Sequence, residues 1–138
     1  MDKRTFRHTE SIIYNYYSLK QEIEDIREGY IEAGMGNGEA YSSMGNGNNS
    51  RTEKQAAKLV DNERMKECQR QVRAIEKAHR AVPDEVKEVV YIKYGIRPGQ
   101  DWEPPDKPYV SERTFYRHRK DFVGLVAQLL GWRREGGE

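Results

Sequence analysis

The 138-residue chain has a single cysteine and no long apolar run. The lone Cys68 excludes a disulfide within the chain, and its helical context predicts a small buried side chain. A helix that crosses a bilayer needs about 20 mostly apolar residues, and no run approaches that length. Residues 1–5 are not followed by the apolar core of a signal peptide. We therefore expect a cytoplasmic protein that does not enter a membrane.

Residue types that carry enzyme chemistry are equally sparse or scattered. The three histidines, His8, His79 and His118, share no metal-ligand spacing, and no Cys/His pair suggests a catalytic dyad. The Gly-rich segment 34–50 does not match a phosphate loop, because no strand precedes it and no Gly-Lys-Ser/Thr follows it. The carboxylates lie at surface-like helical positions. We expect neither an enzyme nor a bound metal or cofactor.

Composition and charge indicate a polar, helical protein with one basic end. Hydrophobic residues make up 36% of the chain, charged residues 34%, and the mean hydropathy is −1.03. These values predict an all-α fold in which long, partly exposed helices surround a thin core. Residues 111–134 contain six Arg and Lys against two acids, whereas residues 21–32 contain five acids against one arginine. This asymmetry is typical of a protein with one nucleic-acid-binding end.

Residues 1–32 form the first predicted segment, an amphipathic helix over about residues 5–31. Its apolar stripe has a spacing of 4-3-4-3-4 and consists of Ile12, Tyr16, Leu19, Ile23, Ile26 and Tyr30. Ile13 and Tyr17 widen the stripe. Two interpretations fit: an ordinary helix of a small bundle, or a coiled coil that forms a homodimer through the same six residues.

Residues 33–51 are rich in Gly, Asn and Ser and predict a flexible linker. A second long helix is expected over residues 52–81, with Thr52 as its N-cap. Its stripe is Met65, Cys68, Val72, Ile75, His79 and Val82, extended less regularly by Ala57 and Val60. The opposite face is charged and predicts a solvated surface. Two such helices joined by a long linker indicate an antiparallel helical hairpin, and His79 is expected to be a core or boundary residue.

The third predicted unit spans residues 82–134 and is followed by a tail, residues 135–138. Pro83 and two acids open a helix, and Gly95 ends it. Its apolar face is Val86, Val89, Val90 and Tyr94. Four prolines in residues 96–109 exclude a long helix there, and we expect Trp102 to fill the core.

A basic helix is expected from Ser111 to about Trp132. Ser111 is a good N-cap, and the buried face is predicted to be Phe115, Phe122, Val126 and Leu129. The opposite side carries Arg and Lys side chains that suit the major groove of DNA, where Arg reads guanine edges and Lys, Thr and Tyr bind phosphates. The candidate DNA-binding residues are Ser111, Arg113, Thr114, Tyr116, Arg117 and Lys120. Arg113 and Arg117 would read bases, and Thr114, Tyr116 and Lys120 would hold phosphates.

The order of these elements resembles a known family. The helix that opens Val82-Pro83 and closes Tyr91-Ile92-Lys93-Tyr94-Gly95 resembles the first helix of a sigma-factor region-4-like helix-turn-helix. Ser111-x-x-Thr114-Phe115-Tyr116-Arg117-His118-Arg119 looks like its recognition helix. With the acidic N-terminal helix, the linker and the final Leu129-Leu130-Gly131-Trp132, the chain is similar to RinA/ArpU-type regulators from phages of Gram-positive bacteria.

That resemblance implies a DNA-binding activator of late or packaging genes that acts in the bacterial cytoplasm. One departure is the stretch 101–108, which takes the place of the second helix of the motif. Because of its prolines, at most a single turn around Trp102 is expected there.

Three other interpretations remain open. The chain could be a small terminase subunit that recognises phage DNA for packaging. It could be a helical adaptor with no DNA role. The acidic N-terminal helix could also contact host RNA polymerase directly.

Overall fold

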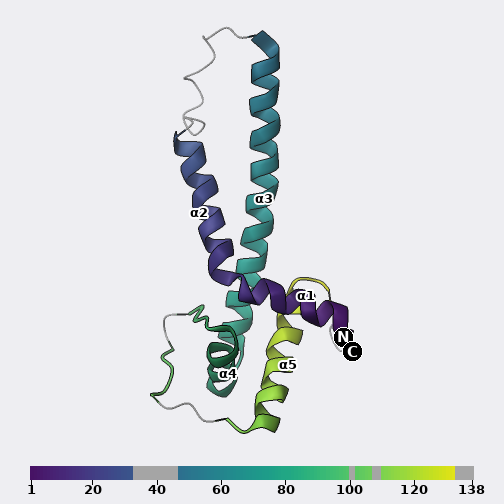
Figure 1. Cartoon of the computed structure of the whole chain (residues 1–138), viewed down its shortest axis with the longest axis vertical. Helices are drawn as coiled ribbons and strands as arrows, with labels where there is room; N and C mark the ends of the chain where they lie inside the picture. Colours follow the sequence, from purple (N-terminus) through teal and green to yellow (C-terminus); the bar gives the residue numbers. More distant parts are fainter. Residues whose placement is uncertain (33–46, 100–101, 107–109, 133–138) are drawn as a thin grey trace. The chain divides into compact units, whose positions relative to one another are not determined.

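The computed structural model describes residues 1–32, 47–99, 102–106 and 110–132, and it is all-helical in its regular structure, as predicted (Figure 1). The helices of these ranges are α1 (Lys3–Tyr14), α2 (Tyr16–Glu32), α3 (Gly47–Ala81), α4 (Asp84–Tyr94) and α5 (Glu112–Leu129). No strand is found in the described ranges. No helix within them is both long and apolar enough to cross a membrane.

The predicted N-terminal helix is broken at Asn15, so a continuous helix over residues 5–31 was wrong. Asp2 caps α1, and its carboxylate accepts a hydrogen bond from the Thr5 N–H at 2.7 Å. Asn15 leaves helical geometry at φ −90° and ψ 13°, while its N–H still bonds to the Ser11 and Ile12 carbonyls. The next helix, α2, begins at Tyr16.

The chain divides into two compact units whose limits differ from the predicted segments. One unit combines Met1–Tyr17 with Arg70–Glu138, and the other is Ser18–Gln69. The first helix, α1, therefore belongs with the C-terminal helices.

The unit Ser18–Gln69 contains segments of α2 and α3 that run side by side in opposite directions (Figure 1). The Arg64 guanidinium donates two hydrogen bonds to the Glu22 carboxylate, one of them at 2.9 Å. Leu19, Ile23 and Cys68 are buried, which confirms three positions of the predicted stripes.

Two details of the second predicted helix were wrong. It begins at Gly47, not near Thr52, so residues 47–51 are helical, and the rest of the predicted linker, residues 33–46, lies outside the described residues. Ala57 and Val60 do not extend the buried stripe: both are exposed, Val60 by 66%.

Most side chains of the stripe that was predicted to form a dimer are buried within the single chain. Tyr16 is fully buried, and its hydroxyl donates to the Glu76 carboxylate at 2.6 Å. Ile12, Leu19 and Ile23 are at most 7% exposed. Tyr17, which was expected to widen the stripe, is instead 53% exposed. A homodimer through this stripe would require these side chains to leave the core, so we do not retain it; the Tyr30 side chain lies outside the described residues.

The core of the other unit is formed where α4 and α1 pack against α5. Val86, Val89, Val90 and Tyr94 are all buried, as predicted. Gly95 ends α4 with φ +66°, a conformation that favours glycine, and its N–H bonds to the Tyr91 carbonyl.

Between α4 and α5, the described residues 95–99 and 102–106 contain no helix, in agreement with the expectation of at most a single turn around Trp102. Trp102 is nevertheless buried and faces the rings of His79 and Tyr91 edge-on, as expected of a core residue. Its carbonyl accepts a hydrogen bond from Arg97 Nε at 2.8 Å. His79 is also buried, as predicted.

Candidate nucleic-acid interface

The start of α5 is fixed by two hydroxyls. Ser111 is the N-cap, as predicted, and its Oγ accepts a hydrogen bond from the Thr114 N–H at 3.3 Å. The same Ser111 hydroxyl donates to Thr114 Oγ1 at 2.9 Å. Both hydroxyls therefore stabilise the first turn of α5, and the main role of Ser111 is that of an N-cap. Thr114 is half-buried, whereas its predicted role was a phosphate contact.

The apolar side of α5 is buried between Phe122 and Ala127. Phe122 and Val126 have no exposed surface, as predicted. Val123 and Ala127 are equally buried, whereas Phe115 and Leu129 are only partly covered. The buried face is thus rotated slightly about the helix axis relative to the prediction.

The other side of the N-terminal half of α5 faces solvent. Four of the six candidate DNA-binding residues lie there and are exposed: Arg113, Tyr116, Arg117 and Lys120. Their spacings of three and four residues place them on one helical face. Tyr116 is 54% exposed. We call these four residues the α5 basic face; it presents three positive charges and one phenol hydroxyl.

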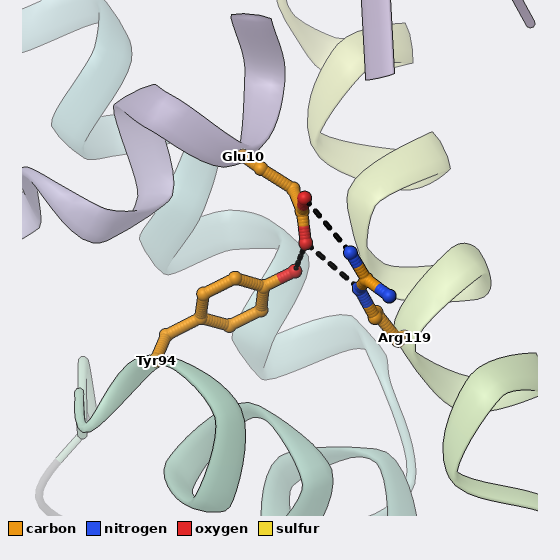
Figure 2. A network of polar contacts seen from close by, with 3 residues as sticks. All are labelled: Glu10, Tyr94 and Arg119. Atoms are coloured by element: carbon orange, nitrogen blue, oxygen red, sulfur yellow. Dashed lines mark hydrogen bonds and ion pairs between the residues drawn. The ribbon is translucent and has the colours of Figure 1, made fainter. Parts of the chain in front are cut away.

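The remaining arginine of this segment, Arg119, is not part of that face. Its guanidinium forms a paired hydrogen bond with the Glu10 carboxylate of α1, from Nε to Oε2 at 2.8 Å and from Nη2 to Oε1 at 3.0 Å (Figure 2). The Tyr94 hydroxyl of α4 donates to the same Glu10 carboxylate at 2.5 Å. One carboxylate from α1 therefore ties together all three helices.

The ionisation of these groups reflects their contacts. Burial by itself would raise the pKa of Glu10, but the hydrogen bonds from Arg119 and Tyr94 outweigh it, and the pKa is lowered. The pKa of Tyr94 is raised by burial and by its bond to Glu10. The bond to Glu10 also raises the pKa of Arg119. At neutral pH the site is thus a carboxylate with a guanidinium and a neutral phenol.

Two aromatic contacts add to the attachment of α1. The Arg119 guanidinium lies 5.2 Å from the centre of the Phe6 ring, a cation–π geometry. Beyond the end of α5, Gly131 adopts φ +82°, and Trp132 stacks on His8 with ring centres 4.7 Å apart. The Trp132 N–H bonds to the Ala127 carbonyl at 2.8 Å.

The C-terminal end of α5 is held by α3. The Arg70 guanidinium donates to the Leu130 carbonyl at 2.9 Å. A cation at this end is favourable for the helix dipole. The exposed basic end of α5 therefore extends from a segment that is fixed by α1, α3 and α4.

Neither Glu10 nor Tyr94 was identified as a site residue from the sequence. Glu10 is the sole acid within α1, and its local sequence does not identify Arg119, 109 positions away, as its partner. Among the described residues, no group of three His, Cys, Asp or Glu side chains could hold a metal ion.

Comparison with known proteins gives no relative. No protein-family model matches the chain, and neither a curated protein nor a solved structure does.

Proposed function

We propose that this chain is a sequence-specific double-stranded DNA-binding regulator that places the N-terminal half of α5 in the major groove. The observation that carries the proposal is the contrast between the two sides of α5. Phe122 and Val126 are fully buried, while Arg113, Arg117 and Lys120 are exposed on the opposite face.

The dimensions of the α5 basic face suit this role. An α-helix with its side chains is about 10–12 Å in diameter, which fits within a major groove about 12 Å wide. In the groove, Arg113 and Arg117 read base edges. Lys120 and Tyr116 hold phosphates on its flanks. Thr114, whose hydroxyl is bonded to Ser111, assists at the phosphate backbone while Ser111 keeps the helix start in place.

In this proposal α4 and α5 are the outer helices of an altered helix-turn-helix. The segment around Trp102 replaces the middle helix, which in ordinary members of this class rests across the DNA backbone. The Glu10 carboxylate, which also accepts a hydrogen bond from Tyr94, holds α5 in place through Arg119. From the resemblance of its sequence to RinA/ArpU-type regulators, we further propose that the chain activates late or packaging genes of a phage in a bacterial cytoplasm, with host RNA polymerase as a further partner.

The direct test is the affinity of the full chain for mixed-sequence duplex DNA, measured by fluorescence anisotropy at several salt concentrations. The parent protein should bind, and its affinity should fall steeply with salt because bound phosphates release counterions. Arg113→Ala/Arg117→Ala/Lys120→Ala should lose most of this affinity. A matched control is Lys58→Ala/Lys66→Ala/Lys77→Ala, which removes three exposed lysines of α3 and therefore the same positive charge. Absence of any salt-dependent binding by the parent would overturn the proposal in favour of an adaptor without a DNA role.

A further inference from the structure

The first helix, α1, carries a second group of exposed cations. Lys3, Arg4 and Arg7 are exposed, and they precede Glu10, the one acid of the helix. The helix α1 packs against α5. The side of α1 on which a cation lies therefore decides whether that cation can reach DNA that is bound by the α5 basic face.

Contacts with α5 define that side. Phe6 and Glu10, which are one helical turn apart, both contact Arg119. Arg119 itself directly precedes Lys120 and lies one turn after Tyr116, both members of the α5 basic face. The Phe6–Glu10 side of α1 is therefore the side nearest to that face.

The position of each cation follows from the helical period of about 100° per residue. On the helical wheel, Lys3 lies about 40° and Arg7 about 80° from the midpoint between Phe6 and Glu10, so both border this side. Arg4 lies about 140° from the same midpoint and therefore projects away from this side. His8 lies on the far side, where it stacks on Trp132 beyond the end of α5.

We propose that Lys3 and Arg7 form a second phosphate-binding strip, which contacts the backbone of the same duplex whose major groove receives α5. This inference rests on the proposed function and extends its binding surface from one helix to two. The pairing of Glu10 with Arg119 matters here, since it neutralises the one carboxylate of α1 that would otherwise repel the duplex. Phosphate contacts of this kind fix the position of a protein on DNA without reading sequence.

The experiment compares three single variants of the full chain, Lys3→Ala, Arg7→Ala and Arg4→Ala, on one duplex over a range of salt concentrations. Each removes one exposed positive charge from the same helix. Lys3→Ala and Arg7→Ala should each lower the slope of log affinity against log salt by about 1. They should weaken binding to all sequences by the same factor, whereas Arg4→Ala should leave the slope unchanged. Arg7→Lys should retain the parent slope.

The outcomes separate this strip from the proposed function. If the parent binds duplex DNA and the Lys3 and Arg7 variants keep its slope, the strip is refuted while the role of α5 stands. Equal losses in all three variants would also refute it, because they would reflect net charge alone. If the parent does not bind duplex DNA, the proposed function fails and the strip with it. Thermal melting of each variant establishes that the fold is unchanged.

Discussion

Glu10 and Arg119 lie 109 positions apart in the chain, yet their side chains form a paired hydrogen bond at 2.8 and 3.0 Å. The carboxylate is also the acceptor for the Tyr94 hydroxyl. This arrangement places an ion pair beside the exposed face of α5. It fixes α5 to α1 and α4 and leaves Arg113, Arg117 and Lys120 outside the pairing.

Removal of the Glu10 carboxylate should destabilise the fold. The Glu10 and Arg119 side chains are 12% and 22% exposed, and Glu10→Ala would leave both Arg119 and Tyr94 without this acceptor. Hydrogen bonds to charged groups contribute about 1.5–3 kcal/mol, so a loss of that order in the free energy of unfolding is expected from urea denaturation. Arg117→Ala, on the exposed face of the same helix, should change it by less than about 0.5 kcal/mol. Equal effects of the two variants would show that the pair does not hold the unit together.

The same pair predicts the direction of a pH effect. The pKa of Glu10 is lower in the folded chain than its ordinary value of 4.5. Ionised Glu10 therefore stabilises the fold at pH values above 4.5, and this contribution is lost as the pH falls through the lower, folded pKa. The parent should be more stable than Glu10→Gln at neutral pH, and the difference should shrink below pH 4.5. A difference that grows on acidification would have the wrong sign.

Base reading and phosphate binding by α5 can be told apart by substitution. Arg117→Ala should cost about 1–3 kcal/mol on a preferred site and relax specificity at one base pair. Lys120→Ala should instead weaken binding about equally on all sequences and reduce the salt slope by about 1. Competition assays with single-base-pair variants of the site measure both. A uniform loss for Arg117→Ala would remove its assigned role in base reading.

Two glycines should respond oppositely to alanine. Gly95 has φ +66° at the end of α4, where a side chain is strained, so Gly95→Ala should destabilise the protein by about 1 kcal/mol. Gly29 lies within α2 and no atom stands within 4 Å of a Cβ added there. Gly29→Ala should be stabilising by about 0.5–1 kcal/mol, since alanine favours helix. Thermal denaturation of both variants checks the signs; the same sign for both would contradict the conformational argument.

Local signals in the sequence were sufficient to predict the ends and the buried faces of α4 and α5 approximately. The N-cap Ser111, the terminating Gly95 and the apolar face from Val86 to Tyr94 are each encoded within a few residues of where they act. The same holds for the exposed side of α5, because a helical period fixes which residues lie opposite Phe122.

What could not be predicted depends on distant packing. The stripe Ile12–Tyr16–Leu19 continues in register across Asn15, so the pattern identified the buried side but not the break in the helix. Val60 was expected to extend the next stripe, though less regularly, but its side chain is 66% exposed. Glu10 and Arg119 each resemble a solvated surface charge, and their pairing arises from the packing of α1 against α5.

The most direct test of the central claim is binding-site selection from a random duplex library, with the parent protein and Arg113→Ala/Arg117→Ala selected in parallel. Base reading by α5 predicts a defined motif for the parent that is lost or blurred in the variant. An identical motif recovered by both proteins, or no enrichment by the parent, would contradict the claim that this face of α5 reads DNA sequence.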